Sequence, residues 1–241
     1  MSDSFATTRW TLVLAAGTDQ TGDTGPASRA LAELCRAYWP PLYAHARRRG
    51  LPPVDAEDSV QGFFDRLLRL ESLSTARRER GRFRSWLLGC FNHYLADLHD
   101  HDRAQKRGAR LQASLDTEAH EAAFASAASP HLSPDHAFDR AWALALLATV
   151  TTRLRDEYQG AGRASHFEML SPALAGRDAD TPHSAIAQKL GLSEPAVRVA
   201  LHRMRQRYRQ LLRDEVSQTV ATPGDIDAEI RHLLAALAMH G

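Results

Sequence analysis

The apolar residues of this 241-residue chain recur at helical spacing, and no segment alternates apolar and polar side chains over the length of a strand. The pattern is clearest around residues 60–68, where positions i, i+3, i+4, i+7 and i+8 are Val60, Phe63, Phe64, Leu67 and Leu68. A stripe with this period covers one face of a helix. The sequence therefore predicts an all-α fold.

Comparable stripes predict helices elsewhere in the chain, over residues 31–49, 83–98 and 138–158. Gly50 and the Pro52-Pro53 pair end the first of these helices. Asp55 is then placed to cap the next helix at its N-terminus. A last amphipathic helix is predicted in the tail of the chain, at residues 226–237.

Residues 183–213 form the most informative stretch of the sequence. Ser184 to Leu190 is predicted to be a short helix, and Gly191 suits its C-cap. Ser193 suits the N-cap of a longer basic helix that carries Pro195 in its first turn. A short helix, a glycine turn and a longer basic helix are typical of a helix-turn-helix.

The longer helix presents Arg198, His202, Arg205 and Arg209 at spacings of three and four, which places them on one exposed side. Such a face fits a DNA major groove, where arginine reads guanine and also binds phosphate. The alternative is the ordinary solvated face of a helical hairpin. We favour DNA contact, because residues 195–213 hold six arginines and no acidic residue.

The net charge of +1 conceals a block-like distribution of charge. Residues 77–110 and 195–213 are basic, whereas residues 111–139 and 214–241 are acidic. Two basic blocks on one chain indicate two contacts with one polyanion. The Ala-, Ser-, His- and Pro-rich stretch between the two blocks predicts a flexible linker.

Catalytic and metal-site signatures are missing from the sequence. Cys35 and Cys90 are the only cysteines, which gives neither a disulfide framework nor a zinc site. His93, His99 and His101 are not spaced to place ligands on one helix face, so we expect no metal. There is no phosphate-binding glycine loop and no nucleophile elbow, so we expect neither enzyme activity nor a cofactor.

The sequence also bears on where the protein works. No uninterrupted apolar stretch approaches 18 residues, so no membrane span is predicted. Residues 1–11 carry Asp3 and lack the apolar run of a signal peptide. With only two cysteines, these features predict a reduced, cytoplasmic protein.

Two motifs precede the linker. Residues 55–64 read DAEDSVQGFF, an amphipathic helix whose acidic face is either simply solvated or a docking face for a basic partner. Residues 81–87 read GRFRSWL, in which aromatic residues stand beside arginines. We assign Phe83 and Trp86 to the core, and the exposed Arg84 with the preceding loop to base or phosphate contact.

These motifs, in this order, resemble a bacterial RNA polymerase sigma factor of the short extracytoplasmic-function (ECF) type. The resemblance implies two small helical domains joined by a flexible acidic linker, the second domain being the helix-turn-helix. The parts are an N-terminal extension (1–27), a region 2-like domain for core polymerase and the minus-ten element (28–110), the linker (111–137), a region 4-like domain for the minus-thirty-five element (138–213) and a tail helix (214–241).

The resemblance implies a non-catalytic subunit that directs promoter-specific transcription initiation. Polymerase binding would fall to Asp55, Glu57, Asp58 and Gln61. Contacts with promoter DNA would fall, in the first domain, to Arg82, Arg84, Asn92, Arg103, Lys106 and Arg107. In the second domain they would fall to Ser193, Arg198, His202, Arg203 and Arg205. The implied partners are core RNA polymerase, promoter DNA and an anti-sigma or other regulatory protein, and we expect a monomer when the chain is free.

Some features depart from the family pattern. Val199 and Ala200 stand where many relatives carry Ser and Arg, which leaves the upstream sequence preference open. The tail helix is extra, and it either packs on the second domain or binds a regulator. Two other functions remain open: a DNA-binding regulator that works without polymerase, and a sigma-like decoy that sequesters a regulator.

Overall fold

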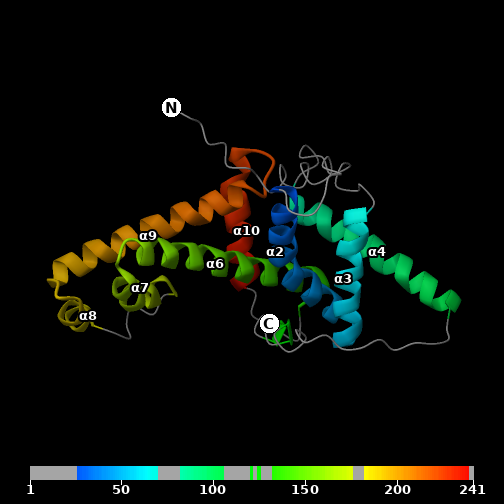
Figure 1. Cartoon of the computed structure of the whole chain (residues 1–241), viewed down its shortest axis with the longest axis horizontal. Coiled ribbons are helices and arrows are strands. Elements are labelled where there is room, and N and C mark those ends of the chain that lie inside the picture. The colour runs from blue at the N-terminus through cyan, green and yellow to red at the C-terminus, as the bar shows by residue number, and fades with distance from the viewer. Residues whose placement is uncertain are drawn as a thin grey trace. The chain divides into compact units, whose positions relative to one another are not determined.

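The computed structural model describes residues 26–69, 82–105, 120–121, 124–125, 132–175 and 182–238. Within these ranges the chain is helical and has no strand, which confirms the predicted all-α class for this part of the protein (Figure 1). No helix in the same ranges is long and apolar enough to cross a membrane. In chain order the elements are α2 (Pro26–Arg48), α3 (Pro53–Arg69), α4 (Phe83–Gln105), α6 (Pro134–Gly160), α7 (Ala164–Leu170), the 3-10 helix η3 (Ser171–Ala175), α8 (His183–Leu190), α9 (Glu194–Ser217), the 3-10 helix η4 (Pro223–Asp225) and α10 (Ile226–Ala238).

The chain divides into two compact units. Unit 1 consists of Met1–Ala145 together with Val216–Gly241, and unit 2 of Leu146–Glu215. The divisions between the units fall inside α6 and inside α9. The sequence placed the second domain at residues 138–213, whereas the first turns of α6 and the tail helix α10 belong to unit 1.

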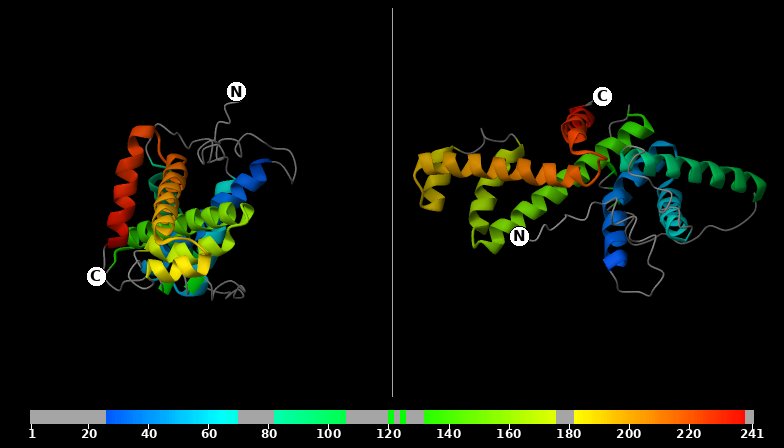
Figure 2. Two further views of the ribbon diagram at one scale, coloured as in Figure 1. Left: turned by 90° about the vertical axis from the view of Figure 1, so that its left-hand side faces the viewer. Right: turned by 90° about the horizontal axis from the view of Figure 1, so that it is seen from above.

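Aromatic side chains of α2, α3 and α4 build the core of unit 1, in which α3 lies against both α2 and α4 (Figure 2). Phe63 meets Phe91 edge to face at 5.1 Å between ring centroids, and Tyr38 meets Phe83 at 5.3 Å. All four residues are buried. Such pairs contribute about 0.5–1.5 kcal/mol beyond the area they bury. The core position predicted for Phe83 is therefore confirmed, and Trp86 beside it is half-buried.

Helix α3 begins earlier than the sequence pattern suggested. Its first residue is Pro53, so Asp55 lies in the first turn and not at the N-cap. Proline suits this start because its fixed φ is already helical and its missing N–H would have no helical partner there. The Asp55 carboxylate still lies at the positive end of the helix dipole. The acidic start of the motif therefore remains favourable for the helix.

The core of unit 2 joins α6, α7, α8 and α9. Its buried members include Leu154, Leu170, Ile186, Val197 and Met204. These residues come from all four helices, and most are completely buried. The apolar stripe of α9 therefore faces inward, which leaves the opposite side of α9 outside this core.

A left-handed glycine connects α8 to α9. Gly191 has φ 65° and ψ 30°, and its backbone N–H and that of Leu192 both donate to the carbonyl oxygen of Ala187. Ser193 then accepts a hydrogen bond from the backbone N–H of Ala196 at 3.4 Å. The sequence predicted both residues in these positions. Glycine is needed at the turn because a Cβ disfavours positive φ.

We expect Gly191→Ala to lower the free energy of unfolding by about 1 kcal/mol, because alanine must adopt the left-handed conformation. The control is Gly89→Ala, in the interior of α4, where an added Cβ meets no atom within 4 Å. Alanine is the better helix former there, so this variant should gain up to about 1 kcal/mol. Urea midpoints followed by circular dichroism measure both effects, and shifts of the same sign would contradict the turn assignment.

Candidate nucleic-acid interface

The outer face of α9 holds most of the second domain's predicted DNA contacts. Arg198, His202 and Arg203 are exposed, whereas the buried stripe of the helix contains Val197, Leu201 and Met204. Successive residues of an α-helix are rotated by about 100°. Seen down the axis, the three exposed residues lie about 100–140° from Val197 on either side.

These cations lack partners in the part of the chain that the structure describes. Arg198, Arg203 and Arg209 make no side-chain hydrogen bond or ion pair there, and all three are exposed. Arg207 on the same helix behaves differently, since it holds Glu157 of α6 through bonds of 2.6 and 2.8 Å. That pairing lowers the pKa of the Glu157 carboxyl. The outer face is thus a part of α9 whose positive charge is not neutralised by the described residues of unit 2.

Arg205 does not lie on this exposed face, contrary to the sequence prediction. It is half-buried, and its guanidinium donates to the carbonyl oxygen of Ala173 in η3 at 3.4 Å. Helix geometry explains this burial, because Arg205 lies only about 40° around the helix axis from the buried Leu201. Its observed contact ties α9 to η3. Ser193, also predicted to contact DNA, is exposed and caps α9 as described above.

Only part of the acidic motif on α3 is exposed to solvent. Asp55, Asp58 and Gln61 are exposed, as expected for a docking face. Glu57 is instead 4% exposed, so its predicted place on a solvated face is wrong. Glu57 precedes the buried Val60 by three residues and Phe64 by seven, which puts it on the apolar stripe.

Residues from the predicted linker cover Glu57. The Nδ1 atom of His120 lies 3.0 Å from the Glu57 carboxylate, and the His120 ring stacks on Trp39 at 5.5 Å. Glu121 accepts hydrogen bonds from the Tyr43 hydroxyl at 2.5 Å and from Arg47 Nε at 2.7 Å. The Arg47 guanidinium lowers the pKa of the Glu121 carboxyl. This described part of the linker therefore packs on α2 and α3.

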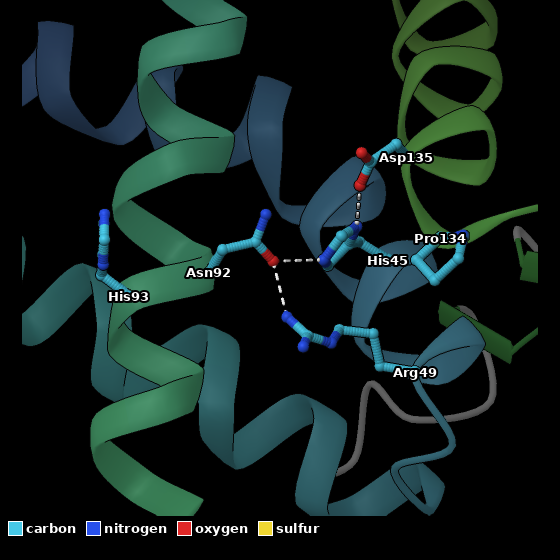
Figure 3. Close-up of a pocket in the computed structure, with 6 residues that line it drawn as sticks. All are labelled: His45, Arg49, Asn92, His93, Pro134 and Asp135. Carbon is cyan, nitrogen blue, oxygen red and sulfur yellow. Dashed lines mark hydrogen bonds and ion pairs between the residues drawn. The ribbon is translucent and has the colours of Figure 1, made fainter.

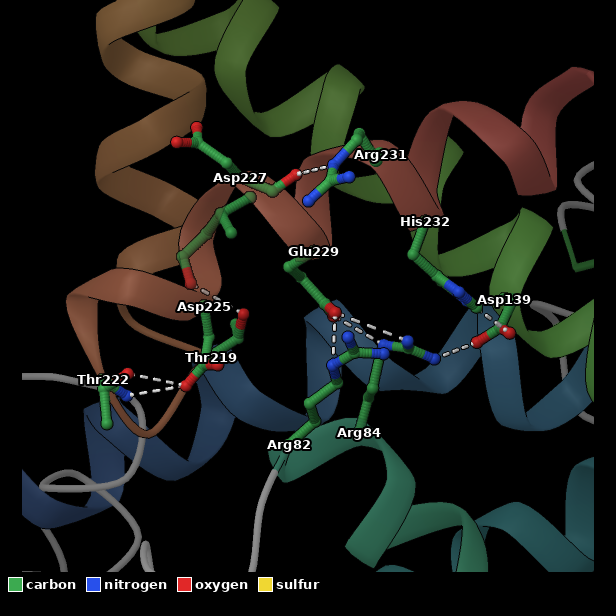
Figure 4. A network of polar contacts seen from close by, with 11 residues as sticks. Arg82, Arg84, Asp139, Thr219, Thr222, Asp225, Asp227, Glu229, Arg231 and His232 are labelled. Carbon is green, nitrogen blue, oxygen red and sulfur yellow. Dashed lines mark hydrogen bonds and ion pairs between the residues drawn. The ribbon is translucent and has the colours of Figure 1, made fainter.

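Two arginines predicted to contact DNA are bound inside unit 1 (Figure 4). Arg84 is 5% exposed, and its Nε donates to Glu229 Oε1 of α10 at 2.6 Å. It also pairs with Asp139 of α6 and lies over the ring of Trp142. Arg82 Nε reaches the second oxygen of Glu229 at 2.8 Å. The predicted exposure of Arg84 is therefore wrong, because a carboxylate from the distant tail binds it.

The tail helix α10 is held by the same contacts. Glu229 has no exposed surface, and His232 Nε2 lies 2.8 Å from Asp139. Arg140 donates to the carbonyl oxygen of Leu237 at 2.7 Å. These partners belong to α4 and to the first turns of α6, all within unit 1. The tail thus packs on the start of α4 as well as on α6, whereas the sequence predicted either packing on the second domain or binding to a regulator.

Asn92 lies in a pocket of unit 1 that sequence reasoning did not find (Figure 3). Its Oδ1 accepts from Arg49 at 2.7 Å and lies 2.8 Å from His45 Nε2. A guanidinium can only donate, so this oxygen is an acceptor and His45 Nε2 carries a proton. His45 Nδ1 faces Asp135 at 3.6 Å. No sequence signal connects Asn92 with these residues of α2 and α6.

Three further predicted DNA contacts lie outside the side chains that the structure describes. Arg103 belongs to α4, but its side chain is outside the described residues, as are Lys106 and Arg107 altogether. In the ranges that the structure describes, no three His, Cys, Asp or Glu side chains gather in a way that could hold a metal ion.

Comparison with known proteins adds no relative. No protein-family model, curated protein or solved structure gives a significant match to the chain. Its function is therefore inferred from its own residues and from the motifs that resemble sigma factors.

We expect Glu229→Gln to lower the free energy of unfolding by about 3 kcal/mol, because Arg84 would remain buried without its full counter-charge. The matched control is Asp97→Asn, which breaks the exposed pair with Arg66 at 2.9 Å and should cost less than about 1 kcal/mol. Urea unfolding measures both variants. Equal costs would show that the Glu229 network does not hold α10 in place.

We expect the stability of unit 1 to fall as the pH is lowered through the ordinary histidine range. Burial lowers the pKa of His45 below that range, so the unfolded chain binds the proton more readily than the folded one. The stability that depends on neutral His45 is fully present above a pH of about 6.5, the pKa of histidine in the unfolded chain, and is lost as the pH falls below it. The negative charge of Asp135 opposes this lowering of the His45 pKa, and the positive charge of Arg49 reinforces it.

Melting temperatures between pH 7.5 and pH 5 test this expectation. His45→Gln should flatten the fall, because the amide can donate to Asn92 but does not titrate. His93→Gln changes an exposed histidine of the same pocket and is the control. If the wild-type slope persists in His45→Gln, another group causes it.

Proposed function

We propose that this protein is a sigma factor of the extracytoplasmic-function type, which binds core RNA polymerase and directs promoter-specific transcription initiation. The observation that carries the proposal is the outer face of α9, where Arg198, Arg203 and Arg209 are exposed and unpaired within the described residues. This face follows a short helix and a left-handed glycine turn. That combination is what a helix-turn-helix needs in order to place a cationic helix in DNA.

In this function α9 enters the major groove of the minus-thirty-five element. Arg198 and Arg209 lie toward one edge of the outer face and suit phosphate contacts, which fix the position of the helix. His202 and Arg203 lie closer to its centre and suit base edges. Arg205 has a different part in the proposal, since its bond to Ala173 supports the position of α9 and does not bind DNA.

The acidic motif of α3 provides the docking face for the polymerase in this proposal. Asp55, Asp58 and Gln61 present exposed carboxylate and amide groups from the first turns of one helix. Glu57 is excluded from that role by its burial under His120. The proposed docking surface therefore contains three of the four residues that the sequence motif suggested.

The minus-ten element would be held by groups of α4 and the residues after it. Arg82 and Arg84 are bound to Glu229, and the Oδ1 atom of Asn92 is bound by Arg49 and His45. The proposal therefore assigns this role to Arg103, Lys106 and Arg107. Binding energy opens the DNA here, and the proposal needs no cofactor and no nucleotide hydrolysis. The protein would act in the cytoplasm, where polymerase and chromosome are found.

The internal binding of Arg82, Arg84 and Glu57 also favours a second candidate function. A sigma-like DNA-binding regulator or decoy needs the outer face of α9 but does not need to capture melted DNA. The two candidates differ in one property, which is whether the chain starts transcription with core polymerase.

The deciding experiment adds the purified chain to core RNA polymerase of the same organism with fragmented genomic DNA and maps transcript starts. Discrete starts that share an upstream sequence support the sigma function. Stable binding to core polymerase without starts favours the decoy. DNA binding without polymerase binding favours the regulator.

We expect Asp58→Arg to weaken binding to core polymerase by about tenfold, because it reverses an exposed charge at the centre of the docking face. Glu168→Arg makes the same change at an exposed site on α7 and should leave the affinity unchanged. Fluorescence anisotropy of labelled chain measures both. DNA binding by α9 should survive in Asp58→Arg, which separates a lost contact from a lost fold.

A further inference from the structure

Val199 is an apolar side chain exposed to solvent among cations. It is 49% exposed, and within the described residues only one other large hydrophobic side chain, Leu234, is exposed. Single exposed apolar residues are common in proteins, so exposure alone carries no conclusion. The position of Val199 on α9 does carry one.

The helix geometry puts Val199 at the centre of the outer face. It lies in the second turn of α9, about 160° around the axis from both Leu201 and Val197. His202 follows it at i+3 and Arg203 at i+4, both exposed on the same side. The first turns of a recognition helix are the part that reaches base edges. Val199 is thus the residue of unit 2 that would face most directly into the groove.

A local structural role does not account for valine at this position. Val199 takes no part in the hydrophobic cluster of unit 2. A β-branched residue on an exposed helix face is also a poorer helix former than alanine. Valine there therefore costs helix stability and returns no packing against the described residues of the unit.

We infer that Val199 is a specificity-determining residue that recognises the 5-methyl group of a thymine in the major groove. The inference rests on the proposed function of α9 as a DNA-reading helix. The thymine methyl is the one apolar group that bases present in that groove, and apolar side chains are its recognised partners. Arg198 and Arg209 bind the surrounding phosphates and so bring the methyl groups of Val199 into contact with the methyl group of the thymine.

The test starts from the full-length chain bound to core polymerase. A random-sequence selection first identifies the preferred upstream element. Each thymine of that element is then replaced, one at a time, by deoxyuridine, which removes only the 5-methyl group. Burying one methyl corresponds to about fourfold in affinity, so we expect a loss of about that size at one or two positions.

The variant Val199→Ala should reduce that difference between thymine and deoxyuridine, because alanine is shorter and offers less apolar surface, while it binds the deoxyuridine element as well as the wild type does. Leu234→Ala, which removes the other exposed large apolar side chain, should retain the full difference. Because both side chains are exposed, we expect both variants to fold, and equal melting temperatures verify this.

Three results would overturn the inference. They are a selected element without thymine, no loss at any deoxyuridine, and an undiminished loss in Val199→Ala. If Val199→Ala weakens binding to every DNA equally, or weakens polymerase binding, Val199 contacts something other than a methyl group. If no sequence is enriched at all, the proposed function of α9 itself fails, which is a distinguishable result.

Discussion

A carboxylate with no exposure to water requires cationic partners, and Glu229 finds two of them in Arg82 and Arg84. This interaction determines much of unit 1. It fixes α10 against the start of α4, and through Arg84 and Asp139 it includes the first turns of α6. It also decides which of the predicted DNA contacts are available, because a guanidinium held in a buried ion pair can leave only at the cost of an unpaired charge.

Helical periodicity and cap residues were enough to predict the long helices and α8, but not the short helices α7, η3 and η4. Phe63 and Val197 are buried, and Gly191 and Ser193 cap α8 and α9 where local residue preferences placed them. These features depend on interactions between residues near one another in the sequence. Local signals of this kind are the ones that a sequence displays directly.

The errors concern side chains whose partners are distant in the sequence. Arg84 is buried by a residue 145 positions away, and Glu57 by one 63 positions away. A charged residue in a motif suggests an exposed side chain. Nothing in the motif reveals the distant partner that buries this side chain. Arg205 is a different case, since its rotation relative to Leu201 was available from the sequence and places it at the edge of the core.

In the proposed function, the outer face of α9 would combine two kinds of contact that respond differently to salt. Arginine–phosphate contacts would supply affinity for any DNA, and salt would weaken them because such contacts release counterions. An apolar contact at Val199 would add discrimination that does not depend on counterion release. Unpaired arginines alone would make α9 a general polyanion binder, whereas a central apolar side chain among them would give the face a means of choosing one sequence over another.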